Sequence, residues 1–196
     1  MVQELEIEFK NLLTKEEFHR LADFFQLTEK DFAEQENYYF DTKCFALKNH
    51  GAALRIRKKK DQYVLTLKEP YHVGLLETHQ FLTDQEAVSA IHESVFPKEG
   101  SVVEKIKQLE IKPESLLCFG SLITSRATKK YKNGEIVLDH SRYENREDFE
   151  IEFEAEDEKE GKQQFLEILN KHNIPIRQTE NKIKRFYSAK FSKENL

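Results

Sequence analysis

With 196 residues, the chain is long enough for one domain with a substantial hydrophobic core. Its fifteen phenylalanines and seven tyrosines exclude a disordered chain, because disordered chains are poor in aromatic residues. The formal net charge of −5 disfavours a general nucleic-acid-binding protein, since such domains usually carry net positive charge. No apolar run approaches the roughly 18 residues of a membrane-spanning helix, and the first residues contain no signal-peptide core. We therefore expect a cytoplasmic protein that binds neither nucleic acid nor membrane.

Two hydrophobic periods alternate along the chain, one typical of half-buried strands and one of amphipathic helices. Strands are predicted over residues 3–10, 33–41, 52–59, 63–69, 74–82, 116–131, 135–143 and 149–156. Helices are predicted after the capping boxes at 14–17 and 83–86, over 157–171, and from Thr179 onwards. These elements predict a single domain over residues 1–196 of the α+β class. We expect an eight-stranded antiparallel β-barrel, or tunnel, with peripheral helices.

Two predicted hairpins set the register of the middle strands. An even-length loop around Lys60-Asp61 places Arg57 opposite Val64 and Arg55 opposite Thr66, with Lys68 on the same face. Side chains two residues apart on a strand share a face, so the two arginines project from the same side of the sheet.

Asn133-Gly134 is a strong hairpin signal between the next two long strands. A two-residue loop at this dipeptide pairs Thr128 with Asp139 and leaves Arg126 diagonally beside that aspartate.

The charged side chains of the predicted strands are sorted by sign. Carboxylates gather on the first and last strands, and basic residues gather on the strands between them. The acidic residues are Glu4, Glu6, Glu8, Glu150, Glu152 and Glu154, and the basic residues are Arg55, Arg57 and Lys68. Any half-solvated antiparallel strand alternates charged and apolar residues, but such strands usually mix the two signs.

This sorting of charge predicts a particular kind of site. Like charges in a row repel one another unless a cation compensates them. Oxygen ligands alone favour Mg²⁺, Mn²⁺ or Ca²⁺ over zinc or copper. Arginine and lysine opposite them would hold phosphate oxygens, so the pattern indicates a metal-assisted clamp for a polyphosphate.

The motifs together resemble the CYTH superfamily, the triphosphate tunnel metalloenzymes, and are similar to its small bacterial members without accessory domains. The family signature is an E-x-E-x-K strand at the N-terminus. Here it reads Glu6-Ile7-Glu8-Phe9-Lys10, followed in order by Leu54-Arg55-Ile56-Arg57, Leu65-Thr66-Leu67-Lys68, Arg126, Asp139, Glu150-Ile151-Glu152, Lys182 and Arg185. The resemblance thus spans nearly the whole chain and implies an eight-stranded tunnel whose charged faces turn inward.

The resemblance also implies a role for each matching residue. Metal ligands would be Glu6, Glu8, Asp139, Glu150 and Glu152. Residues that grip the triphosphate would be Lys10, Arg55, Arg57, Lys68, Arg126, Lys182 and Arg185. Glu6, Glu8 and Lys10 would be catalytic, with Mg²⁺ or Mn²⁺ as cofactor.

Three functions follow from these expectations. The first is metal-dependent hydrolysis of a small triphosphate, with inorganic triphosphate ahead of thiamine triphosphate or a nucleoside triphosphate. The second is cyclisation of ATP, as in class IV adenylate cyclases, and the third is a non-catalytic module that binds polyphosphate or nucleotide. A homodimer is an open expectation, favoured if helices leave apolar strand faces uncovered.

Overall fold

The computed structural model describes residues 2–191, and the chain divides into two compact units. The first unit contains the residues up to Glu6 and those from Gln35 to Ser121, and the second contains Ile7–Glu34 and the residues from Leu122 onwards. The strands are β1 (Val2–Glu6), β2 (Glu8–Leu13), β3 (Ala33–Thr42), β4 (Ala53–Lys59), β5 (Gln62–Pro70), β6 (Leu75–Leu82), β7 (Leu116–Tyr131), β8 (Gly134–Tyr143) and β9 (Arg146–Ala155). Their hydrogen-bonded order is β1-β6-β5-β4-β3-β7-β8-β9-β2, and all the described pairs are antiparallel.

The first unit packs its core against one face of its strands. Leu54, Ile56, Leu65 and Leu67 of β4 and β5 are fully buried there. The helices α3 (Asp84–Val88) and α4 (Ser101–Gln108) cover this face, and the short helix α2 (Ala46–Asn49) follows β3. The predicted capping box at 83–86 is confirmed, because the Thr83 hydroxyl accepts from the Glu86 amide. A π-helical turn over 89–93 follows α3 directly.

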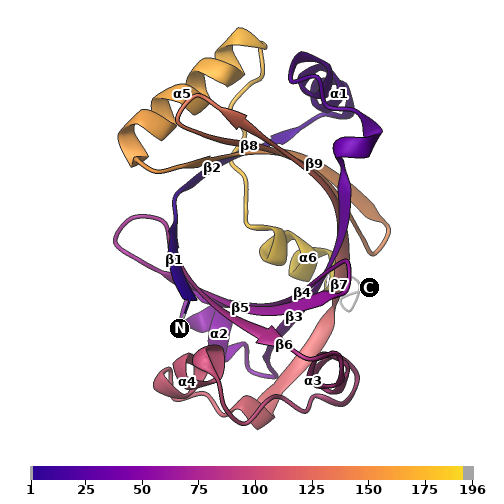
Figure 1. The fold of residues 1–196 in the computed structure, drawn as a ribbon, viewed down its shortest axis with the longest axis vertical. Helices are drawn as coiled ribbons and strands as arrows, with labels where there is room; N and C mark the ends of the chain where they lie inside the picture. The colour runs from indigo at the N-terminus through magenta and orange to yellow at the C-terminus, as the bar shows by residue number, and fades with distance from the viewer. Residues whose placement is uncertain (1, 192–196) are drawn as a thin grey trace. The chain divides into compact units, whose positions relative to one another are not determined.

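The second unit packs its core in the same way against two longer helices. The helices α1 (Lys15–Phe24) and α5 (Glu158–Lys171) lie on the outer side of β8 and β9 (Figure 1). Phe18 and Leu21 of α1 and Phe165 of α5 are buried in one core cluster with residues of these strands. The predicted cap of α1 is confirmed, because the Thr14 hydroxyl accepts from the Glu17 amide. Asp157, predicted as the first residue of the next helix, is the cap of α5, and its carboxylate accepts from the Glu160 amide. The opposite face of β8 and β9 therefore remains available for polar residues.

The prediction of one strand over residues 3–10 was wrong. The ladder is interrupted at Ile7, because β1 pairs with β6 whereas β2 pairs with β9. The described chain consequently has nine strands where eight were predicted, while the antiparallel α+β class is confirmed.

The predicted start of the last helix was also wrong. The helix α6 runs from Lys182 to Phe191, and Thr179 is not its cap. The Thr179 hydroxyl instead accepts from the Leu12 amide and donates to the Arg177 carbonyl. These contacts tie the segment before α6 to β2. None of the described helices combines the length and hydropathy needed to cross a bilayer.

The first predicted hairpin register is confirmed, whereas the second was wrong by two residues. Arg57 lies opposite Val64 and Arg55 opposite Thr66. In the second hairpin, however, Arg126 itself lies opposite Asp139.

The turn of this second hairpin is one residue earlier than predicted. Lys132 takes the positive φ of 52°, and Gly134 is the first residue of β8. A Cβ at Gly134 would lie 2.4 Å from the carbonyl oxygen of Glu154 and 2.6 Å from the Phe153 ring. The glycine is therefore required by close packing in the strand. A shift of two residues preserves each side chain's face.

Replacing Gly134 with alanine is expected to destabilise the protein by about 1–3 kcal/mol, the usual cost of overpacking. The added methyl meets backbone and an aromatic ring, neither of which moves freely. Urea unfolding measures the change. Asn133→Ala, in the exposed turn next to it, is the control and is expected to unfold at a urea concentration close to that of the wild type. Equal stability of the two variants would contradict the packing argument.

Candidate active site

Three carboxylates lie buried on β8 and β9 of the second unit. Asp139 is directly opposite Glu150, and Glu152 follows two residues later on the same strand face. The exposed fractions are 0% for Asp139, 1% for Glu150 and 4% for Glu152. Buried carboxylates are rare unless they are paired with cations or bind metal.

One ammonium group of α6 lies among these three carboxylates. The Nζ atom of Lys182 is 2.8 Å from Asp139 Oδ2 and 3.2 Å from Glu150 Oε1, and it also contacts Glu152 Oε1. The three acidic side chains therefore converge on a single cationic atom.

Two arginines complete the same cluster. Arg126 of β7 donates from Nε and Nη2 to the two oxygens of Asp139, at 2.7 and 2.6 Å, and from Nη2 to Glu152 at 2.7 Å. Arg185 of α6 donates to Asp148 at 2.9 Å and contacts Glu150. The bidentate Arg126–Asp139 pair has the planar geometry that arginine also uses to bind phosphate.

The strand β2 adds the second half of the N-terminal motif. Lys10 lies opposite Glu152 in the register, and its ammonium group contacts Glu8. Burial alone would lower the pKa of Lys10, but the charges of Glu8 and Glu152 outweigh it and the pKa is raised. Lys10 therefore stays positively charged beside the acidic strand.

The charges of the cluster fix its protonation states. Burial alone would raise the pKa values of Asp139 and Glu152, but nearby Lys182 and Arg126 outweigh it and lower both. For Glu150, burial prevails and the pKa is raised. Burial would lower the pKa of Lys182, yet Asp139 and Glu150 raise it above its ordinary value.

These shifts predict that the protein loses stability in acid. Asp139 and Glu152 have folded-state pKa values below their unfolded values of 3.8 and 4.5, so their stabilisation is complete above about pH 4.5 and is lost as the pH falls. The raised pKa of Glu150 opposes this effect in part. The free energy of unfolding, measured with urea from pH 7 to 3, is expected to decline, with a shallower decline in Asp139→Asn. An identical pH dependence in that variant would contradict the assignment.

The donor chemistry of this cluster fits a hard divalent metal. Its candidate ligands are carboxylate oxygens, the type that Mg²⁺ and Mn²⁺ prefer, and three of them already surround one cation. Within residues 2–191, no group of three or more acidic, histidine or cysteine side chains has the spacing of a ready-made metal site. The carboxylates are held instead by basic side chains, so a metal would have to replace or share these partners.

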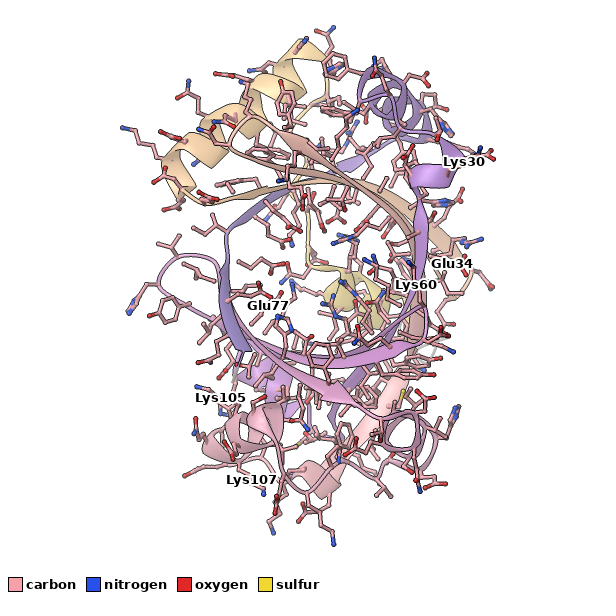
Figure 2. All side chains as sticks on the ribbon, viewed as in Figure 1. Lys30, Glu34, Lys60, Glu77, Lys105 and Lys107 are labelled. Carbon is pink, nitrogen blue, oxygen red and sulfur yellow. The ribbon has the colours of Figure 1, made fainter. Side chains whose placement is uncertain are left out.

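The first unit carries a second charged cluster. Lys68 of β5 donates to Glu6 at 2.6 and 2.9 Å and also contacts Glu77 of β6. Figure 2 shows Glu77 on the sheet face opposite α3 and α4. Burial would raise the pKa of Glu77, but Lys68 and Arg55 outweigh it and lower the pKa. Arg57 donates from Nε to the buried Asn37 amide oxygen at 2.9 Å, which fixes its direction.

The structure thus distributes the predicted residues between the two units. Asp139, Glu150, Glu152, Glu8, Lys10, Arg126, Lys182 and Arg185 belong to the second unit, and Glu6, Arg55, Arg57 and Lys68 belong to the first. Glu6 and Glu8 do not share a single strand as predicted, because the ladder breaks between them.

Sequence reasoning gave no firm role to several polar residues in these clusters. Asp148 binds Arg185, and Asn37 binds Arg57. Glu77 of β6 lies directly opposite Lys68 of β5 and pairs with it, a contact that alternation along the strands does not predict.

The arrangement of buried carboxylates, lysines and arginines has counterparts among known proteins. A sequence profile described as the CYTH domain matches residues 4–187, which is most of the chain. The chain belongs to the CYTH family. The enzymes of this family are triphosphatases or adenylate cyclases, and its triphosphate tunnel enzymes depend on divalent metal. The antiparallel barrel with peripheral helices that the sequence predicted is the fold of this family.

Individual CYTH relatives match over nearly their whole length. A Bacillus subtilis protein named "Putative triphosphatase YjbK" is 56% identical over 190 residues, covering 97% of this chain and 98% of the relative. A solved structure from Bacillus halodurans, described as a "putative adenylate cyclase", has a TM-score of 0.92 and 45% identity, covering 96% of this chain and all of that one.

A more distant solved CYTH-like structure supports the fold alone. This is HpAC1 from Hippeastrum, for which a dominant triphosphatase activity is described. Its TM-score is 0.75 at 24% identity, and the match covers 94% of this chain and 96% of that one.

Proposed function

We propose that this CYTH protein hydrolyses a small triphosphate with the help of Mg²⁺ or Mn²⁺, and that residues 1–196 act as one domain. The observation that carries the proposal is the convergence of three buried carboxylates on a single cationic atom, beside the bidentate Arg126. The name of the 56% identical relative supports the same reaction class.

The acidic residues are the proposed metal ligands. Asp139, Glu150 and Glu152 of the second unit would hold the ion, and the family motif implies the same role for Glu8 of that unit. The motif also implies a metal-binding role for Glu6, which belongs to the first unit. A bound divalent ion neutralises phosphate charge and lowers the pKa of a water molecule. The carboxylates themselves orient the reacting groups and accept hydrogen bonds from water.

The basic residues are the proposed phosphate ligands. Lys10, Arg126, Lys182 and Arg185 lie in the second unit, and their ammonium and guanidinium groups would exchange a carboxylate partner for a phosphate oxygen. Arg55, Arg57 and Lys68 in the first unit are proposed to bind phosphate as well. Arg55 Nε is buried and makes no hydrogen bond among the described residues, as expected of a donor that serves a ligand.

The reaction requires little covalent chemistry from the protein. The water oxygen forms a bond to the terminal phosphorus, the bridging P–O bond breaks, and the water proton passes to the surrounding solvent or carboxylate. Because phosphoryl transfer depends mainly on position and charge neutralisation, a clamp of lysines and arginines suits it.

Inorganic triphosphate is the proposed substrate, ahead of thiamine triphosphate and nucleoside triphosphates. The test is to incubate the purified protein with each compound and Mg²⁺ or Mn²⁺, and to identify the products by phosphorus NMR. Diphosphate and phosphate in equal amounts are expected from inorganic triphosphate. Cyclic AMP and diphosphate from ATP would establish a cyclase instead, and tight binding without products would establish a binding module.

A further inference from the structure

A histidine outside the family motif joins a hydrogen-bonded chain on the charged face of the first unit. His79 Nδ1 lies 2.9 Å from Thr66 Oγ1, and Nε2 lies 2.7 Å from Glu4 Oε1 and 3.4 Å from Glu77 Oε2. Glu77, labelled in Figure 2, precedes His79 by two residues on β6 and so shares its face. The proposed reaction gives no role to His79 or Thr66.

The register aligns this chain with a proposed phosphate ligand. Arg55 lies opposite Thr66, and Thr66 lies opposite His79, so the three form one row across β4, β5 and β6. Thr66 is only 2% exposed. Its hydroxyl therefore stands between the imidazole and Arg55, whose Nε makes no hydrogen bond among residues 2–191. A phosphate oxygen bound by Arg55 would therefore lie close to the Thr66 hydroxyl.

The protonation state of His79 decides whether the Thr66 hydroxyl can donate a hydrogen bond to an anion. An ionised Glu4 only accepts hydrogen bonds, so Nε2 of His79 carries a proton. In the neutral ring Nδ1 is then an acceptor, and Thr66 must give its single proton to it. In the imidazolium Nδ1 donates to Thr66 Oγ1, and the hydroxyl proton is free to donate to an anion.

We propose that Thr66 is a phosphate ligand of this protein and that His79 is the positioning residue that turns its hydroxyl toward the phosphate. This inference rests on the proposed function, because it takes Arg55 as a phosphate ligand. The imidazolium form binds the triphosphate more tightly than the neutral form, since it frees a donor and adds positive charge.

Charged groups from all four strands surround His79. Glu4 of β1 and Glu77 of β6 bring negative charge close to the imidazole, whereas Lys68 of β5 and Arg55 of β4 bring positive charge to the same face. A phosphate bound beside Thr66 adds negative charge and shifts the balance toward the imidazolium. Substrate affinity is therefore linked to the protonation of His79.

The test is steady-state hydrolysis of inorganic triphosphate at about pH 6 and about pH 8.5, a range over which the charge of an imidazole can change. At the lower pH, Thr66→Val is expected to raise KM about 10-fold with little change in kcat, because it removes a hydrogen bond to a charged group. Thr66→Ser keeps the hydroxyl and is expected to retain the low KM. In His79→Gln, KM is expected to lose the part of its pH dependence that His79 supplies, because the amide does not gain or lose a proton over this range.

The triphosphate itself changes protonation between these pH values. This effect is the same for every protein, so it cancels when the KM of each variant is divided by the KM of the wild type at the same pH. The matched control is His140→Gln, which breaks another histidine–glutamate pair, His140–Glu147 at 2.8 Å, and is expected to leave the ratio near one at both pH values. A Thr66→Val protein with wild-type KM at the lower pH would overturn the proposal. So would a His79→Gln protein that keeps the wild-type pH dependence of KM.

The wild-type protein in the same experiment tests the proposed function separately. If the wild type releases no phosphate, the proposed hydrolysis is wrong. The dissociation constant of inorganic triphosphate, measured by calorimetry, then takes the place of KM in the comparison. In that measurement, about 10-fold weaker binding by Thr66→Val at the lower pH supports the inference. Equal affinity of wild type and variant overturns it.

Discussion

Replacing Glu152 with glutamine is expected to lower the rate of metal-dependent phosphate release by more than about 100-fold. Replacing a residue that only supports a metal ligand typically costs about 10- to 100-fold, and a ligand itself should cost more. The substitution preserves shape but removes one of the three carboxylates around Lys182, and it also removes the charge that Arg126 contacts. A neutral amide is a poorer ligand for a hard cation than a carboxylate. Initial rates of phosphate release from inorganic triphosphate with Mn²⁺ measure the effect.

A surface carboxylate on the same strand provides the control for this experiment. Glu147 of β9 is half exposed and pairs with His140, so Glu147→Gln is expected to retain wild-type activity. Circular dichroism and thermal unfolding establish that both variants are folded. Turnover by Glu152→Gln at the rate of Glu147→Gln would remove Glu152 from the site.

Replacing Lys182 with methionine is expected to destabilise the protein by about 3–5 kcal/mol, the cost of breaking a buried ion pair from one side. The variant leaves Asp139, Glu150 and Glu152 without the ammonium on which they converge. Arg126 and Arg185 still compensate part of this charge. Urea unfolding measures the loss. Millimolar Mg²⁺ is expected to restore stability to this variant more than to the wild type, since the carboxylates can then bind a metal.

Lys184→Met is the matched control for Lys182→Met. Lys184 lies on the same helix, but its side chain is 60% exposed and its ion pair with Glu180 is on the surface. Exposed pairs of this kind contribute little to stability, so the control is expected to unfold close to the wild type with or without Mg²⁺. Equal stability of both variants would show that Lys182 does not hold the cluster together.

The sequence predicted the faces of the strands better than their boundaries. Alternation alone placed Arg55 and Arg57 on one face, and the turn at 60–61 gave their cross-strand partners correctly. Side chains alternate between the two faces of a strand, so a shift of two residues leaves each of them on the same face. The predicted faces are therefore correct despite the two-residue error at Asn133-Gly134. That error arose because a glycine required for packing in a strand also looks like a turn residue.

The errors that affected the site came from interactions between distant segments. Nothing in the alternation from Gln3 to Lys10 indicates that the strand changes partner at Ile7. Likewise, the hydrogen bond of Thr179 with Leu12 of β2 joins residues 167 positions apart, and α6 begins only at Lys182. Parity predicts which residues share a face, but the pairing of individual acids and bases requires the folded chain.

The most direct test of the central claim is the binding of Mn²⁺ in the presence of inorganic triphosphate, followed by electron paramagnetic resonance. The wild type is expected to bind the ion tightly, and the Asp139→Asn, Glu150→Gln and Glu152→Gln proteins are each expected to bind it at least about 10-fold more weakly. Undiminished Mn²⁺ binding by all three folded variants would contradict the assignment of the buried carboxylates as the metal site.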